Sequence, residues 1–390
     1  MKAESERGVS QRERLEVAVT AMLPAALGLL GPIVGRAGRL AWLGPVLALP
    51  VGLILCRLWA RLGERNLSDG LKQAFGPWGG RAVQLLYLLW GLFLLAGSAR
   101  RYSDRLMTTV QGEAVRWLFL TAALVLVVWL GRGNGAVFAR TGRLFFLAAA
   151  AALGFALLLA LPALEWRNLW PPGQSDWRGL AGGAALSLSL AGYGIYTLCL
   201  PRRQEYGMRT WHWAAWSCGI LALLIVAVIG AFGPGLTVRM EEPFLFLLEG
   251  VEVPGAFRRG EAALVAILAL ADVALLTLLA RGCGALWRGV VPPWKGRGWV
   301  LMTAVVFWLA GVLPGRGTTR LLTEAAAAAG NLIFGVLIPT VAVFMIKIRE
   351  RREEEPIFCG KEEIKSADVG LNQEKEKGRT KKRKKVPKNS

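Results

Sequence analysis

Asp272 is the residue of this chain whose position is chemically most unusual. It lies near the centre of an apolar segment, within Leu270-Ala271-Asp272-Val273-Ala274. A carboxylate in mid-membrane costs about 2.5–3.5 kcal/mol on insertion scales, so such acids face the protein interior, take up a proton or pair with another group. We therefore predict that Asp272 binds a ligand or a proton, with a structural hydrogen bond to another helix as the alternative.

A second group of candidates lies in the glycine-rich centre of the apolar segment 179–200. Gly192 and Gly194 bracket Tyr193, and Tyr196 follows. An interrupted helix in lipid is tolerated only where its backbone is buried in protein or lines a cavity. Amides at the end of a half-helix also bind anionic groups such as a carboxylate. We predict that these four residues contact a ligand; a kinked, packed helix is the alternative.

A matching interruption is expected in the first apolar segment. Pro24 and Pro32 each remove a helix hydrogen bond and clash with the preceding turn. The small residues Ala25, Ala26 and Gly28 let either a ligand or a neighbouring helix approach the backbone. We predict that Pro24, Ala25, Ala26 and Gly28 line the binding site, with close helix packing as the alternative.

The third apolar segment supplies one further candidate. Gln84, Tyr87 and Gly91 recur at helical spacing on one face, and we add Tyr87 to the predicted ligand contacts; packing is the alternative. The single histidine, His212, argues against metal or triad chemistry, and no phosphate-binding loop or nucleophile–base pair is present. We therefore expect no enzyme activity, cofactor or metal.

The composition places these residues in a membrane. The chain is 54% hydrophobic yet carries a net charge of +20, which suits a membrane protein whose charges lie in loops and a tail. Crossing a bilayer takes about 20 residues. Ten apolar segments reach or approach this length, at residues 15–34, 39–58, 80–98, 116–131, 143–162, 179–200, 212–234, 262–281, 298–314 and 325–347.

The ten predicted transmembrane helices divide into five and five. Because each half holds an odd number, the second half starts from the opposite face of the membrane, and helices 1 and 6 become equivalent. Both interruptions fall in these helices, which is a sequence sign of a transporter-type site. We predict an all-α integral membrane bundle with a five-plus-five inverted repeat and broken helices 1 and 6. The distribution of Lys and Arg favours both termini in the cytoplasm.

Two regions differ in composition. Residues 1–348 hold the apolar segments and form the predicted membrane domain, whereas residues 349–390 are rich in Lys and Glu. Such a polar segment buries too little apolar surface to offset the loss of chain entropy on folding. We therefore predict a disordered cytoplasmic tail. Its basic cluster, residues 381–385, either contacts anionic lipid or serves as a solvated topology signal. We expect no nucleic-acid partner.

The chain between helices 7 and 8 contains a helix start. Glu241 and Glu242 precede Pro243, and acids with proline at the first turn are typical of helix N-termini. The apolar run that follows, residues 244–248, is too short to cross a bilayer. We predict an external lid or re-entrant helix, or a helix lying flat at the interface.

Several short motifs, in order along residues 10–350, are shared with a known family. They are Ala21-Met22-Leu23 leading to Gly31-Pro32, residues 37–43 with Trp42, residues 71–80, Arg143-Leu144-Phe145-Phe146, Asn168-Leu169-Trp170-Pro171, Phe232-Gly233, Glu242-Pro243 and Arg259-Gly260-Glu261. In these motifs the chain resembles the endospore germination permeases, the integral-membrane B subunit of spore germinant receptors. It departs from them at Pro24-Ala25-Ala26, where the family often has a glycine pair.

The resemblance implies a fold and a role. The fold is a LeuT-like bundle of the amino acid–polyamine–organocation superfamily. The implied role is binding of a small nutrient germinant, such as an amino acid, at the spore inner membrane, with a receptor A subunit, a C-subunit lipoprotein and the lipid bilayer as partners. A proton-coupled amino acid permease, favoured by Asp272, and a scaffold with a vestigial pocket are the alternatives.

Overall fold

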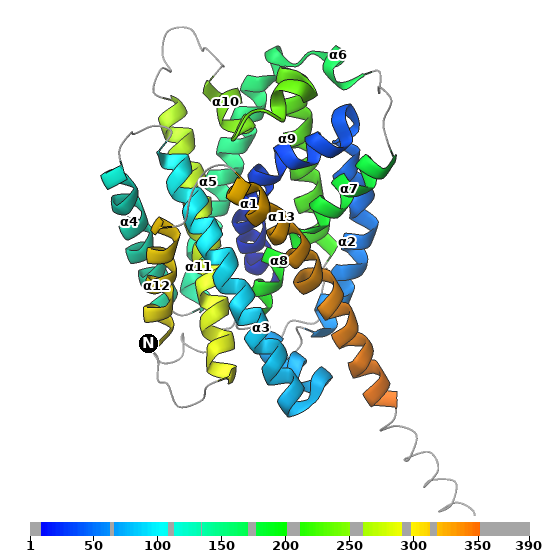
Figure 1. Cartoon of the computed structure of the whole chain (residues 1–390), viewed down its shortest axis with the longest axis vertical. Helices are drawn as coiled ribbons and strands as arrows, with labels where there is room; N and C mark the ends of the chain where they lie inside the picture. The colour runs from blue at the N-terminus through cyan, green and yellow to red at the C-terminus, as the bar shows by residue number, and fades with distance from the viewer. Residues whose placement is uncertain are drawn as a thin grey trace, which may run out of the picture. The chain divides into compact units, whose positions relative to one another are not determined.

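The computed structural model of the chain is nearly all helical (Figure 1). It describes residues 9–62, 66–107, 113–133, 135–170, 177–200, 211–249, 260–290, 298–312 and 318–351. The chain divides into two compact units, residues 1–342 and 343–390. The predicted tail beyond Arg351, with its basic cluster at 381–385, lies outside the described residues.

The first half of the chain forms long helices joined by short connections. They are α1 (Gln11–Ala37), α2 (Leu43–Leu62), α3 (Leu67–Leu106), α4 (Glu113–Arg132) and α5 (Gly135–Ala160). The 3-10 turns η1 (Gly38–Leu40) and η2 (Leu161–Ala163) and the short helix α6 (Trp166–Leu169) lie between or after them.

The second half opens with an interrupted helix. It consists of α7 (Trp177–Leu188), α8 (Ala191–Gly194) and the 3-10 segment η3 (Ile195–Cys199). The elements that follow are α9 (Trp211–Thr237), α10 (Pro243–Glu249), α11 (Gly260–Val290), α12 (Gly298–Val312), α13 (Thr318–Leu332) and the π-helical turn η4 (Ile333–Leu337), after which the helix continues to Arg351. The helix start predicted at Pro243 is confirmed.

The described helices form a membrane protein. Eight of them are long and apolar enough to cross a bilayer, and α12 is a shorter apolar helix. The outer helices expose large apolar side chains, such as Leu118 (65% exposed), Leu144 (67%) and Leu301 (66%), as lipid-facing surfaces require. The predicted all-α integral membrane fold is confirmed, while the number of ten spans stays a prediction.

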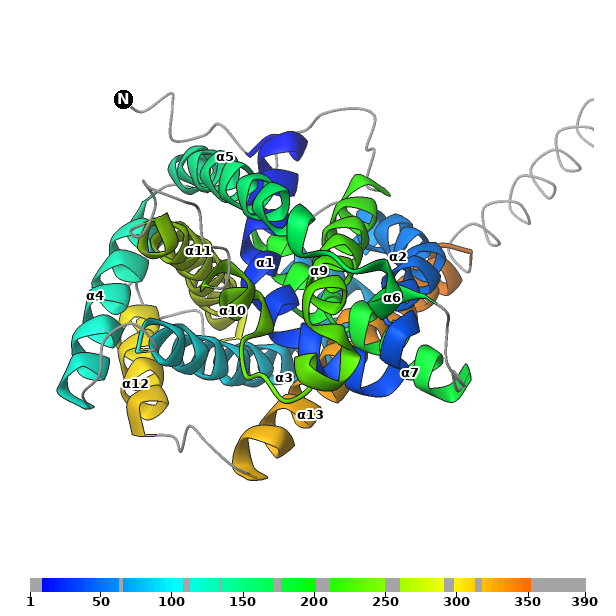
Figure 2. The same cartoon turned by 90° about the horizontal axis from the view of Figure 1, so that it is seen from above.

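Helices α1 and α11 form the centre of the bundle. In their apolar windows 78% and 72% of residues are buried, against 22% in α4 and α5. Seen from above, α1 lies among α5, α9, α11 and α3 (Figure 2). Helix α1 also packs on α7, and α11 packs along α3. A ligand held at α1 and α7 is therefore shielded from lipid by the surrounding helices.

The two helices expected to be broken differ. Helix 6 is broken as predicted, since α7 ends at Leu188 and the chain resumes as α8. Helix 1 is not broken, because α1 is one continuous helix with Pro24 and Pro32 inside it. Each proline removes one hydrogen bond, which kinks a helix without ending it when the preceding residue stays helical.

Where a glycine with positive φ precedes proline, the chain does turn sharply. Gly76 (φ 80°) comes before Pro77 in α3, and Gly233 (φ 71°) comes before Pro234 in α9. Both corners share the sequence Ala-Phe-Gly-Pro. They lie between the second and third helix of each predicted half, which is the placement that an inverted repeat requires.

Candidate functional site

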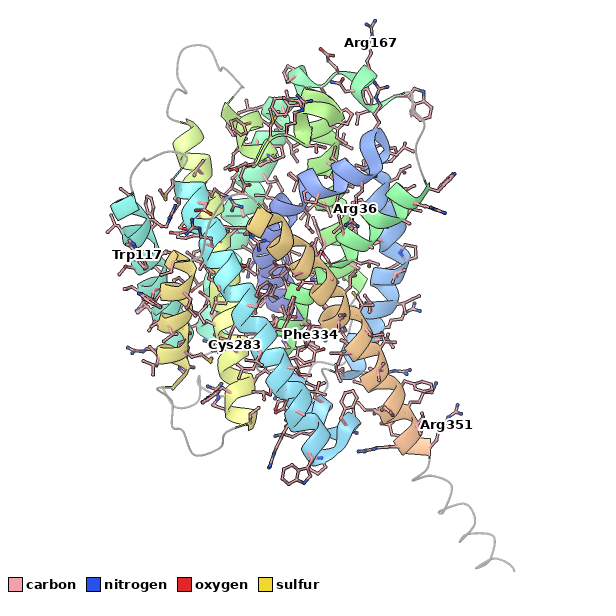
Figure 3. All side chains as sticks on the ribbon, viewed as in Figure 1. Arg36, Trp117, Arg167, Cys283, Phe334 and Arg351 are labelled. Atoms are coloured by element: carbon pink, nitrogen blue, oxygen red, sulfur yellow. The ribbon has the colours of Figure 1, made fainter. Side chains whose placement is uncertain are left out.

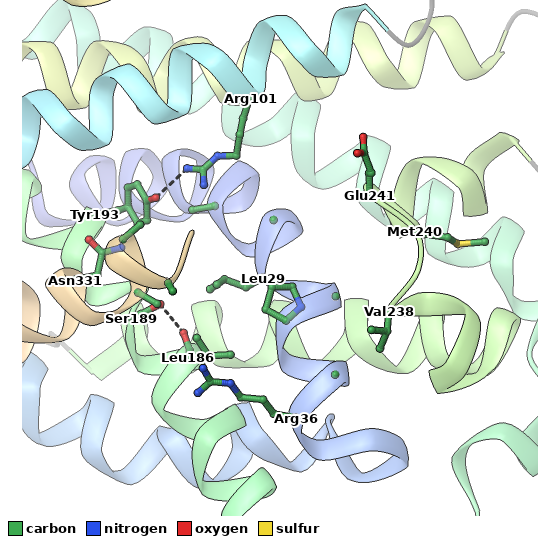
Figure 4. Close-up of a pocket in the computed structure, with 18 of the residues that line it drawn as sticks. Leu29, Arg36, Arg101, Leu186, Ser189, Tyr193, Val238, Met240, Glu241 and Asn331 are labelled. Atoms are coloured by element: carbon green, nitrogen blue, oxygen red, sulfur yellow. Dashed lines mark hydrogen bonds between the residues drawn. The ribbon is translucent and has the colours of Figure 1, made fainter. Parts of the chain in front are cut away.

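A cavity of about 540 Å³ lies in the first unit beside the helix 6 interruption. Helix α1 supplies seven of its lining residues, between Ala25 and Arg36. The rest of the wall comes from Arg101 of α3, Leu186 of α7, Ser189, Tyr193 of α8, the segment 238–241 after α9 and α13 residues from Ala325 to Asn331 (Figure 4). The volume is that of an ordinary small-molecule pocket.

The floor of the cavity is polar. Arg101 Nη2 donates hydrogen bonds to Tyr193 Oη at 2.9 Å and to Ser98 Oγ at 3.3 Å. Asn331 Oδ1 accepts from Trp90 Nε1 at 3.1 Å. Tyr193 and Asn331 line the cavity yet are only 4% and 2% exposed, so this end is deep. Buried donors held by such bonds are suited to orienting a ligand.

The mouth of the cavity is charged. Arg36, Arg239 and Glu241 line it and are exposed. Figure 4 shows Arg36 and Arg101 on opposite sides of the cavity, with Glu241 farther along its wall. Counting Arg101, the described lining residues include three arginines and one acid. These described residues carry a positive balance of charge, which favours anionic or zwitterionic ligands.

Three of the predicted ligand contacts lie on this cavity. They are Ala25 and Gly28 of α1 and Tyr193 of α8. Gly28 lies across from Arg101, and a Cβ built on Gly28 would be 4.0 Å from Arg101 Cδ. The backbone of α1 is thus open to the cavity here, and a larger side chain at residue 28 would enter it.

The glycines of the interruption are not on the cavity wall. A Cβ on Gly192 would lie 2.3 Å from Asn331 Oδ1, and one on Gly194 would lie 2.4 Å from Met22 Cε. Both are therefore positions of close helix approach. Pro24 and Ala26 are buried within α1 and likewise stand outside the lining.

Tyr87 and Tyr196 lie in a packed region beyond the interruption. Tyr87 Oη donates to the Phe334 carbonyl at 2.6 Å, and Tyr196 Oη donates to the Tyr87 carbonyl at 2.8 Å. Neither tyrosine has any exposed surface. Phe334 and Cys283 mark this region in Figure 3, displaced along the bundle from Arg36. These tyrosines seal the bundle and do not line the cavity.

Asp272 has a fixed partner. Its Oδ2 lies 2.6 Å from Arg105 Nη1, and Glu242 Oε1 at the start of α10 lies 3.6 Å from Arg105 Nη2. The Arg105 and Asp272 side chains are 2% and 4% exposed. Asp272 is outside the cavity lining. The ion pair joins α3 to α11, which is the kind of pairing that a buried membrane acid requires.

Sequence reasoning missed Arg101 because it ended the third segment at residue 98. Helix α3 continues to Leu106, so Arg101 and Arg105 belong to the helix. The signal was present, since the face that begins with Tyr87 and Gly91 continues at helical spacing to Arg101 and Arg105. Basic residues were instead assigned to a loop, and the lining residues Ser189 and Asn331 carried no pattern of their own.

Comparison with known proteins identifies the family. The family model described as "Spore germination protein" matches residues 17–312. The chain belongs to the spore germination protein family. No curated protein matches the chain in sequence.

Solved transporters share the fold. Mhp1, a nucleobase-cation-symport-1 family transporter in a closed conformation with bromovinylhydantoin bound, superimposes with a TM-score of 0.60 at 13% identity, covering 87% of this chain and 78% of its own. A manganese transporter from Eremococcus coleocola gives a TM-score of 0.51 at 15% identity, covering 86% and 74%. This member of the spore germination protein family therefore shares its fold with these two transporters.

Proposed function

We propose that this chain is the integral-membrane B subunit of a spore germinant receptor and binds a small nutrient, such as an amino acid, in the cavity beside α1 and α8. The observation that supports this most is the deep polar end of the cavity, where Arg101 and Tyr193 are bonded to one another. The family membership supports germination as the process, and the transporter fold supports a small molecule as the ligand.

The geometry of Asp272 favours a receptor over a proton-coupled permease. The permease alternative depended on a mid-membrane acid available to a ligand or a proton. Asp272 instead pairs with Arg105 at 2.6 Å and lies outside the cavity. A charged pair of this kind holds helices together and needs no proton cycle.

The family membership also supports a proposed setting for the chain. A receptor B subunit lies in the spore inner membrane with both termini in the cytoplasm, and assembles there with an A subunit and a C-subunit lipoprotein. In that orientation α1 runs outward from Gln11, so the cavity, built on the later half of α1, opens to the outer face of the membrane.

The test combines germination with transport. Spores that lack this chain should lose the germination response to at least one amino acid in a panel and regain it on complementation. Reconstituted into proteoliposomes, the protein should bind that amino acid without accumulating it. Accumulation that responds to an imposed pH gradient would establish the permease instead, and an unchanged germination response to every amino acid would refute the receptor role.

A further inference from the structure

We infer that the deep end of the cavity binds an oxygen atom of the ligand through two neutral donors, the side-chain amide of Asn331 and the hydroxyl of Tyr193. The inference rests on the proposed function, because it assigns the chemistry of the same cavity. The ligand class is a small molecule with a carboxylate or another carbonyl group, and the oxygen of that group, rather than an amine, is held at the deep end.

The backbone amides of the interruption are already used within the chain. Gly192 N donates to the Ser189 carbonyl at 3.0 Å, and the nitrogens of Tyr193 and Gly194 donate to the Leu190 carbonyl at 3.1 and 3.2 Å. A ligand that bound these amides would have to displace a backbone acceptor. Recognition at this end of the cavity therefore falls to side-chain donors.

The amide of Asn331 has a fixed orientation. Trp90 Nε1 lies 3.1 Å from Asn331 Oδ1, and an indole N–H can only donate. The oxygen of the amide therefore faces Trp90, which leaves the NH2 group on the other side. Trp90 is itself held by stacking on Phe334, with ring centroids 5.2 Å apart and ring planes 9° apart. A donor fixed in this way loses little side-chain freedom when a ligand binds.

The NH2 group of Asn331 is available to a ligand. In the part of the chain that the structure describes, the contact with Trp90 is the one hydrogen bond of this side chain, so both amide hydrogens lack an acceptor there. Asn331 lines the cavity and is only 2% exposed. A buried donor without an acceptor is costly, so a ligand that brings an oxygen to it is favoured.

Tyr193 supplies a second donor beside the first. Its Oη accepts from Arg101 Nη2 at 2.9 Å and makes no other hydrogen bond among the described residues, so the hydroxyl hydrogen is left for an acceptor. Gly192, the residue before Tyr193, packs against Asn331, and Figure 4 shows the Tyr193 and Asn331 side chains at the same end of the cavity. One carbonyl or carboxylate group has the lone pairs to accept from both donors.

Both donors stand at irregular points of their helices. Tyr193 follows the interruption of helix 6, and Asn331 comes two residues before the π-helical turn η4. The two irregular segments pack together, since a Cβ built on Gly335 of η4 would lie 2.5 Å from Gly192 N. Single π-helical turns within a helix are frequent at functional sites, which agrees with a binding role for this end of the cavity.

The experiment measures how strongly the full-length protein in lipid nanodiscs prefers probes that carry a carbonyl oxygen. The probes are the twenty common amino acids, their carboxamides, and the amines that remain when the carboxyl group is removed. Wild type is compared with N331D, W90F and N168D. N331D keeps the oxygen that faces Trp90 and replaces the NH2 group by an acceptor. N168D makes the same exchange in α6, outside the cavity lining.

At least one amino acid and its carboxamide should bind wild type and N168D about tenfold or more tightly than the matching amine does. N331D should weaken both of these probes about ten- to a hundredfold, because an acceptor then faces an acceptor, and should leave the amine no weaker than before. W90F keeps a ring against Phe334 but releases the Asn331 amide, so it should reduce the preference several-fold. It carries the comparison if N331D lowers the unfolding temperature.

A preference for carbonyl probes that N331D retains, or that W90F retains where N331D does not fold, overturns the inference. So does a wild-type protein that binds the amines as tightly as the amino acids, or that binds no probe. Failure of the proposed function is a separate result, because an oxygen preference that depends on Asn331 in a protein whose deletion leaves germination intact would refute the receptor role only.

Discussion

Arg101 and Arg105 lie one turn apart on the same face of α3, yet their side chains have different surroundings. Arg105 is 2% exposed and meets a fixed acid, Asp272, at 2.6 Å. Arg101 is half-buried, lies on a cavity wall and bonds to the hydroxyls of Tyr193 and Ser98. The two arginines therefore differ in burial and in place, because Arg105 pairs with a buried acid between helices whereas Arg101 reaches hydroxyls on the cavity wall.

The same division separates two tyrosines of the interrupted helix. Tyr193 Oη accepts from Arg101 at the cavity, and Tyr196 Oη donates to the Tyr87 carbonyl in the packed region. We conclude that the interruption separates two sides of the bundle. The binding side holds Tyr193 and Arg101 at the cavity, and the sealing side holds Tyr196 and Tyr87 in the packed region. Substitutions on the sealing side should change stability, and substitutions on the binding side should change affinity.

Removing the acid that pairs with Arg105 should cause the largest loss of stability. Asp272→Ala removes the nearer acid from the buried Arg105 cation and leaves Glu242 at 3.6 Å, so it should lower the free energy of unfolding by up to about 3–5 kcal/mol.

Asp104→Ala is the milder comparison, because Asp104 is 38% exposed and its buried partner Arg100 keeps hydrogen bonds to the carbonyls of Ala310 and Gly311. Its loss should cost about 1–2 kcal/mol. Unfolding in mixed micelles measures both, and equal losses would contradict the structural role of Asp272.

Adding a methyl group on the sealing side should cause the next largest loss of stability. A Cβ on Gly91 would lie 2.6 Å from Cys283 Sγ and 2.8 Å from Tyr196 Oη, so Gly91→Ala should cost about 1–3 kcal/mol. Gly97, on the same helix, has nothing within 4 Å of its Cβ position, and Gly97→Ala should be neutral or stabilising by up to about 1 kcal/mol. Thermal unfolding of the two variants gives the difference, and a Gly91→Ala protein as stable as Gly97→Ala would mean that this side is loosely packed.

The smallest expected effects distinguish the two tyrosines. Tyr196→Phe removes the bond to the Tyr87 carbonyl and should cost about 1 kcal/mol of stability, with ligand affinity unchanged. Tyr193→Phe should change stability by no more than about 1 kcal/mol, because water in the cavity can replace the lost hydroxyl, and should weaken ligand binding a few-fold, because Tyr193 lines the cavity. Calorimetric titration beside thermal unfolding separates these outcomes, and the reverse pattern would exchange the two sides.

The sequence predicts the fold better than the site. Three predicted features depend on local chemistry and are found in the structure. They are the long apolar helices, the interruption at the Gly-rich centre of helix 6 and the helix start at Pro243. The break predicted in helix 1 is wrong, because proline without a positive-φ glycine only kinks a helix.

The site residues that the sequence does not predict depend on contacts between distant parts of the chain. Whether Gly192 opens to a ligand or receives a neighbouring helix depends on Asn331, which lies far along the chain. Whether Asp272 is available depends on Arg105, from a segment assigned to a loop. Local patterns identify residues that are costly in a membrane, but only packing shows which of them is satisfied.

The most direct test of the binding cavity is to fill it. Gly28→Leu places a side chain opposite Arg101, while Gly97→Leu makes the same change where the Cβ position has no neighbour within 4 Å. Equilibrium binding of the amino acid that the wild type recognises, measured in nanodiscs, should be lost in Gly28→Leu and retained in Gly97→Leu, with both proteins unfolding at the wild-type temperature. Wild-type affinity in a folded Gly28→Leu protein would show that the ligand binds elsewhere and would contradict the account.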